Sequence, residues 1–136
     1  MKKINFLFLI PFLLLIAGSC KKKKKDAHVP PDVNLKSGGN YTSGDKTLAH
    51  GDSILVGIIA KKTEDDLRSY NASYAYDGAG TTTTFFNVYL SASEYEYYEK
   101  DLWLKTRAVA GSEKWTFSIV DKDGNITQKS LVLTVQ

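Results

Sequence analysis

The sequence predicts an all-β domain in which about seven short strands form an antiparallel sandwich of two sheets. Three segments alternate apolar and polar residues with the period of two that a half-buried strand requires. Turn-forming residues separate these segments, and every strand candidate falls within residues 32–136. That length corresponds to one domain. We therefore do not expect a two-domain enzyme with a cleft between its domains.

The three clearest strands are residues 53–60, 114–121 and 130–136. The first has apolar residues on both faces, which indicates a central strand. The other two are apolar on one face and flank the turn sequence of residues 121–125, which predicts a hairpin. The residues expected to point into the core are Ile54, Val56, Ile58, Ala60, Trp115, Phe117, Ile119, Leu131, Leu133 and Val135.

Four further strands are predicted where β-branched and aromatic residues, which favour sheets, are enriched. These candidates are residues 33–36, 68–76, 82–90 and 102–107. Seven strands at this spacing are typical of an immunoglobulin-like sandwich.

Residues 91–105 leave two interpretations open. Ser91 and Glu94 stand at the spacing of a helix capping box, which favours a helix. The alternative is a loop followed by a strand, and we favour it because the sandwich otherwise lacks a strand here. The inward residues of that strand would be Leu102, Leu104 and Thr106.

Residues 1–19 have the layout of a secretory signal peptide, with two lysines before an apolar stretch. That stretch, residues 6–17, would span only about 18 Å as a helix, against a hydrocarbon core of about 30 Å. The sequence Ala17-Gly18-Ser19-Cys20 resembles a bacterial lipobox, which implies cleavage before Cys20 and acyl chains on its thiol. Several acyl chains make a stable membrane anchor. An uncleaved membrane anchor is the alternative, because five lysines follow the apolar stretch.

Charge divides the chain into a basic N-terminal part and an acidic domain. The chain has 18 Lys and Arg against 15 Asp and Glu, but seven of the cations precede residue 26, so residues 26–136 carry 11 − 15 = −4. We expect residues 20–31, with their lysine run and two prolines, to form a disordered tether beside the membrane. The lysine run has no interleaved aromatic residues, so nucleic acid is not an expected partner. Cys20 is the only cysteine, so no disulfide is expected in the domain.

Asp121, Asp123 and Asn125 have the spacing of the first three ligands of a calcium loop. The bidentate acid of such a loop would stand at its twelfth position, which is Val132 here. We therefore favour a hairpin turn, keep a calcium site as the alternative, and expect no other cofactor.

Catalysis is not expected. Glu64-Asp65-Asp66 is expected to form a solvated acidic loop. Glycosidase catalysis requires two carboxyls that face each other across a cleft at about 5 to 9.5 Å, and a sandwich of this size offers little cleft. His50 precedes a Gly-Asp turn, and no Gly-x-Ser-x-Gly elbow accompanies it. A small hydrolase is therefore the least favoured of the functions considered.

Aromatic residues are concentrated between residues 70 and 103. Such rings can fill a core, or they can stack on a sugar or a partner protein. The candidate binding residues are Tyr95, Tyr97, Tyr98 and Trp103. We expect the three tyrosines to remain partly exposed, because glutamates are interleaved with them.

Residues 111–125, GSEKWTFSIVDKDGN, and the last strand at 131–135 resemble the end of the Ig-like domains found in small lipoproteins of the Bacteroidota. The resemblance implies a sandwich and a location in the cell envelope. We predict a lipid-anchored protein of the outer membrane with a non-catalytic interaction or spacer domain, whose partner is an envelope protein or a glycan. A periplasm-facing position is favoured, because the lysine run differs from the acidic export signals of surface lipoproteins. The alternative function is a glycan-binding module that uses exposed Tyr and Trp.

Overall fold

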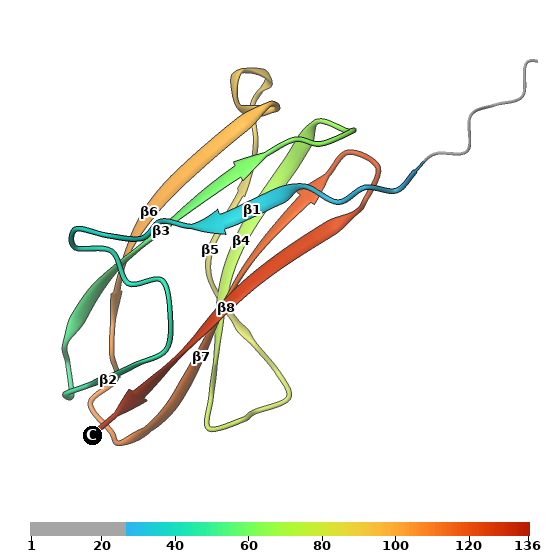
Figure 1. Cartoon of the computed structure of the whole chain (residues 1–136). Coiled ribbons are helices and arrows are strands. Elements are labelled where there is room, and N and C mark those ends of the chain that lie inside the picture. Colours follow the sequence, from blue (N-terminus) through green and yellow to red (C-terminus); the bar gives the residue numbers. More distant parts are fainter. Residues whose placement is uncertain (1–26) are drawn as a thin grey trace, which may run out of the picture.

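The computed structural model describes residues 27–136, which form two β-sheets packed face to face (Figure 1). A three-stranded sheet has the order β1-β3-β6, and a five-stranded sheet has the order β2-β8-β7-β4-β5. The predicted β-sandwich is therefore confirmed, with eight strands in place of about seven. The elements are β1 (Asp32–Leu35), β2 (Lys46–Leu48), β3 (Ser53–Lys61), β4 (Leu67–Tyr76), β5 (Thr83–Tyr89), a short 3₁₀ turn η1 (Ala92–Glu94), β6 (Tyr97–Lys105), β7 (Gly111–Asp121) and β8 (Ile126–Val135). The predicted signal peptide, Cys20 and the lysine run lie outside the described residues.

The first two strands divide the N-terminal part of the domain between the two sheets. β1 pairs antiparallel with β3, whereas β2 crosses to the other sheet and pairs parallel with β8. The other neighbouring strands pair antiparallel, as an immunoglobulin-like sandwich requires. β2 was not predicted, because its three residues carry no alternating pattern and its partner strand lies about 85 residues away in the sequence.

The core consists of the inward faces of both sheets, as alternation predicts. All ten residues that we expected to point inward are buried. The predicted hairpin is also confirmed, since β7 and β8 pair antiparallel across residues 121–125.

The region of residues 91–105 forms a turn and a strand rather than a helix. The backbone N–H and the hydroxyl of Ser91 both donate to Glu94 Oε2, at 2.8 and 2.7 Å, but they hold only the single turn η1. Strand β6 begins at Tyr97, five residues before the predicted strand. The predicted inward residues Leu102, Leu104 and Thr106 are buried.

Contacts with the sandwich begin at His28 and Val29, within the segment assigned to the tether. The Thr63 hydroxyl donates to the carbonyls of Val29 and Pro30 at 2.9 and 3.0 Å, and the Thr127 hydroxyl donates to that of Pro31. The chain thus enters at the end of the sandwich that carries the β3–β4 and β7–β8 loops (Figure 1). Among residues 27–136, no helix has the length and apolar character needed to cross a membrane.

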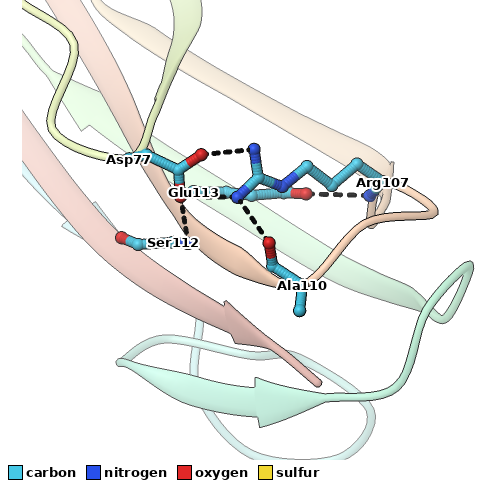
Figure 2. Close-up of polar contacts among 5 residues, drawn as sticks. All are labelled: Asp77, Arg107, Ala110, Ser112 and Glu113. Carbon is cyan, nitrogen blue, oxygen red and sulfur yellow. Dashed lines mark hydrogen bonds and ion pairs between the residues drawn. The ribbon is translucent and has the colours of Figure 1, made fainter.

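At the opposite end of the sandwich, an ion pair connects the β4–β5 loop to the β6–β7 loop (Figure 2). The Arg107 guanidinium donates to both carboxylate oxygens of Asp77, at 2.7 and 2.6 Å. Asp77 also accepts the backbone N–H of Ser112 at 2.8 Å, and Arg107 donates to the carbonyl of Ala110 at 3.3 Å. The hydrogen bonds from Arg107, and next that from Ser112, lower the pKa of Asp77 to about 2.

Gly111 leaves room for this ion pair. Its φ is +144°, and an added Cβ would overlap the Arg107 guanidinium and the Asp77 carboxylate. The neighbouring Glu113 is 0% exposed and accepts the backbone N–H of Arg107 at 2.8 Å and Trp115 Nε1–H at 3.1 Å. A buried carboxylate with two donors satisfies the requirement that buried polar groups be hydrogen-bonded.

Candidate binding site on the outer face of the three-stranded sheet

Strand β6 places two exposed aromatic residues on the outer face of the three-stranded sheet. Tyr97 is 44% exposed and Trp103 is 64% exposed. They share a face because successive side chains of a strand alternate, and six residues at about 3.4 Å each separate them by about 20 Å. Glu99 and Asp101 stand between them on the same face and are also exposed.

The other two candidate residues, Tyr95 and Tyr98, do not lie on this exposed face. The expectation that Tyr98 remains partly exposed is wrong. Tyr98 is 6% exposed because strand alternation turns it into the core, where its ring lies 5.6 Å from that of Tyr70. Burial raises its pKa to about 12. Tyr95 is half-buried and packs against the core, with Lys122 Nζ 3.5 Å from the centre of its ring. Only Tyr97 and Trp103 therefore belong to one exposed surface.

An ionic cluster lies between the two aromatic residues. Asp101 accepts hydrogen bonds from Lys36 Nζ and from the Tyr41 hydroxyl, both at 2.8 Å. Lys36 Nζ also lies 3.6 Å from Glu99, whose carboxylate accepts the Tyr97 hydroxyl at 2.8 Å. The hydrogen bond from Lys36 lowers the pKa of Asp101, and the bond to Asp101 raises the pKa of Lys36. These bonds fix the side chains that surround the exposed rings.

Gly57 forms the floor of this cluster. It pairs with Asp101 in the register of β3 and β6. A Cβ at this position would lie 2.5 Å from Lys36 Cδ, 2.6 Å from Asp101 Oδ1 and 2.9 Å from Tyr41 Cε1. This cluster was not predicted from the sequence. The available signal was this glycine inside an otherwise apolar strand, because such a glycine often marks close approach of another group.

A pocket of about 390 Å³ lies beside Trp103. It forms because the loop after β1 returns to the edge of β3, where Thr42 N–H donates to the Leu55 carbonyl at 2.8 Å. Leu55 in turn pairs with Trp103 across β3 and β6. The lining residues are Gly39, Asn40, Tyr41, Thr42, Lys46, Ser53, Ile54, Leu55 and Trp103.

The lining combines apolar groups with short polar side chains. Trp103 and Leu55 supply apolar surface, and amide and hydroxyl groups offer both hydrogen-bond donors and acceptors. Lys46 is the one charged residue of this lining, which contains no carboxylate and no histidine. A second pocket of about 380 Å³ lies on the β1–β8 side. Its lining is mostly polar and has no aromatic residue: Asn34, Leu35, Ser37, Ser43, Lys129 and Ser130.

The residues of the possible calcium site make the contacts of a hairpin turn. Asp121 is buried, and its two carboxylate oxygens accept the backbone N–H and the side-chain amide of Asn125 at 2.8 and 3.0 Å. The Asp123 carboxylate lies 3.3 Å from His28 Nδ1. Among residues 27–136, no group of three or more His, Cys, Asp or Glu residues is arranged to hold a metal ion. The turn interpretation accounts for these contacts.

The remaining acidic and histidine candidates lie on loops. Asp66 pairs with Lys62 and Lys122 at 3.2 and 2.9 Å, which fastens the β3–β4 loop to the β7–β8 hairpin. The hydrogen bond from Lys122, followed by that from Lys62, lowers the pKa of Asp66. His50 is exposed in the turn between β2 and β3. Neither His50 nor Asp66 lines either of the two pockets.

Comparison with known proteins shows similarity in fold. No protein-family model matches the chain, and no curated protein matches it. A chitin binding domain from Burkholderia pseudomallei is similar, with a TM-score of 0.51, 10% identity, and coverage of 69% of this chain and 58% of that domain. This chain thus spans less than two thirds of that domain.

Two further solved structures align less well. A family 123 glycoside hydrolase from Clostridium perfringens has a TM-score of 0.49 and 7% identity, with coverage of 78% of this chain and 27% of that one. The CARDB domain of the PF1109 protein from Pyrococcus furiosus has a TM-score of 0.47 and 12% identity, with coverage of 83% and 99%.

Proposed function

We propose that this chain is a lipid-anchored envelope protein whose sandwich is a non-catalytic binding domain. The domain binds through the outer face of the three-stranded sheet, at the pocket beside Trp103. The observation that carries the proposal is the exposure of Trp103, 64%, at the rim of a pocket that polar groups also line. Tryptophan supplies much of the binding energy in protein interfaces and ligand sites. A domain that acted only as a spacer would need no such arrangement.

The pocket lining supports a binding role rather than catalysis. General acid–base or nucleophilic chemistry requires a carboxylate, a histidine or an activated nucleophile within hydrogen-bond reach of the substrate. The residues that line this pocket include no carboxylate or histidine, so Ser53 has no base beside it there. The nearest carboxylate of the cluster, Asp101, is already engaged by Lys36 and Tyr41.

The position of the pocket supports attachment through the N-terminus. The chain enters the sandwich beside Thr63 and Thr127, whereas the pocket lies near the other end of β3 and β6, where Ser53 pairs with Lys105. A lipid on Cys20 would therefore hold the domain by the end away from its binding surface. One similar solved structure is described as a chitin binding domain, which is consistent with this fold serving as a binding module.

The test measures binding of the purified full-length protein, in detergent micelles, to isolated envelope fragments. We expect Trp103→Ala to weaken binding at least about tenfold, because it removes the exposed ring. Tyr89→Ala is the matched control, since Tyr89 is an exposed aromatic residue on the other sheet. Equal binding by the two variants, or no binding by the unchanged protein, would contradict the proposal.

A further inference from the structure

The charge of the pocket indicates the class of ligand. Lys46 is the one charged lining residue, and no carboxylate of residues 27–136 lies within ion-pair distance of it. Among the described lysines, Lys36, Lys62 and Lys122 pair with acids, whereas others such as Lys105 do not, so Lys46 is distinguished by its place in this pocket. A cation that no carboxylate of the described residues neutralises favours an anionic group in this pocket.

The shape and lining of the pocket indicate a small, hydroxyl-rich ligand. Its volume of about 390 Å³ is near the lower end of the range of ligand pockets, about 300 to 1,000 Å³. The indole of Trp103 and the side chain of Leu55 lie side by side on paired strands and provide an apolar platform. Asn40, Thr42 and Ser53 offer an amide and two hydroxyls. A pyranose ring, with apolar C–H faces and hydroxyls around its edge, matches both features.

We propose that the pocket binds a uronic acid residue of a polysaccharide. The sugar ring stacks on Trp103, its carboxylate pairs with Lys46, and its hydroxyls bond to the amide and hydroxyl groups of the lining. This inference rests on the proposed function and adds the ligand class to it. The ionic cluster of Lys36, Tyr41 and Asp101 holds the adjacent wall in place, because each of its bonds is already formed without ligand.

The experiment titrates full-length protein in detergent micelles with defined hexasaccharides and follows tryptophan emission. Trp103 is exposed and Trp115 is buried, so a ligand that covers the pocket shifts the emission of Trp103. The probes are hexamers of galacturonate, mannuronate and glucuronate, together with methyl-esterified galacturonate, which keeps the ring and removes the charge. We expect saturable binding of at least one acidic hexamer, and for galacturonate a loss of at least about tenfold on esterification.

Two lysine variants test which lysine pairs with the carboxylate of the ligand. Lys46→Gln is expected to weaken binding of the acidic hexamer about tenfold, whereas Lys129→Gln, at the second pocket, leaves it unchanged. Circular dichroism confirms that both variants fold. The inference is overturned if no acidic hexamer binds, if the neutral ester binds equally well, or if Lys46→Gln has no effect. In each of these cases the proposed function stands if Trp103→Ala still weakens binding to envelope fragments at least about tenfold, and it fails separately if that variant binds normally.

Discussion

At the scale of single residues, Gly111 is a position where one added methyl group is expected to destabilise the fold. It combines a positive φ with a neighbouring ion pair that occupies the space a Cβ would take. Gly111→Ala should therefore strain the backbone and separate Arg107 from Asp77. We expect a loss of about 2 to 4 kcal/mol in the free energy of unfolding, measured by urea denaturation.

Gly80→Ala provides the control for this substitution. Gly80 lies in the β4–β5 loop with nothing within 4 Å of an added Cβ. Its substitution should change the free energy of unfolding by less than about 1 kcal/mol, through the entropy of the unfolded chain. Similar losses for the two variants would show that the ion pair does not depend on the glycine.

The Asp77–Arg107 ion pair also predicts a dependence of stability on pH. Arg107 and Ser112 depress the pKa of Asp77 to about 2 in the folded protein, below the usual value of about 3.9 in an unfolded chain. The ionised carboxylate therefore stabilises the fold above pH about 4, and this contribution is lost as the pH falls through about 2.

An Asp77→Asn variant tests this pH dependence. It should lose less stability than the unchanged protein between pH 4 and pH 2, because it has no carboxylate to protonate. Thermal unfolding followed at pH 4, 3 and 2 measures the difference. Parallel pH profiles for the two proteins would contradict the assignment.

At the scale of elements, β5 is the edge strand that is open to pairing. β1 and β2 are edges of only four and three residues, and β6 carries several charged residues. β5 has seven residues, no charge, and the exposed aromatic residues Phe85 and Tyr89. Long uncharged edges promote association between chains, and natural proteins often protect them with lysine.

Asn87→Lys should reduce self-association of the protein without lowering its melting temperature. Asn87 is exposed near the centre of β5, so the added charge opposes docking of another strand. Light scattering at high concentration measures the effect, and the expected outcome is a higher onset concentration. Gln136→Lys adds the same charge outside the strands and should leave the onset where it is. If both variants shift the onset equally, net charge rather than the β5 edge controls association.

The elements also show what local sequence can predict. Strands with alternating apolar residues, such as β3 and β7, were predicted with their core faces, because burial imposes a period of two on each strand. The capping box of Ser91 and Glu94 is a real local signal, but the inward residues of β6 override it after one turn. Strand β2 could not be predicted, because a three-residue parallel pairing leaves no pattern in the sequence.

The site was predictable only in part, because it also depends on pairing between strands that are distant in the sequence. Trp103 could be selected as a candidate binding residue, but exposure was expected of Tyr98, which alternation along the strand turns into the core. Lys36 and Tyr41 reach Asp101 across 65 and 60 residues of sequence, so their cluster depends on the pairing of β1, β3 and β6. Apart from Gly57, the local sequence carries no signal of such pairings.

At the scale of the whole molecule, the N-terminal segment and the Trp103 pocket lie near opposite ends of the sandwich. The N-terminal segment joins the sandwich beside the β3–β4 loop, and the Trp103 pocket lies near the opposite end. An anchored domain would therefore present the pocket away from the membrane. This separation is consistent with attachment at Cys20, and the anchor and the Trp103 site are tested separately.

Cys20→Ala tests the anchor directly. We expect the unchanged protein to partition with membranes and to carry the mass of acyl chains, because several chains at about 0.8 kcal/mol per buried CH₂ make a stable anchor. The variant should lose the acyl mass and be either released or retained with its signal peptide, which intact-mass spectrometry distinguishes. Ser19→Ala keeps the cysteine and a small residue before it, so it should behave as the unchanged protein does. A variant whose mass differs only by the substitution and whose membrane partition is unchanged would refute the anchor while leaving the Trp103 site to be judged by its own binding assay.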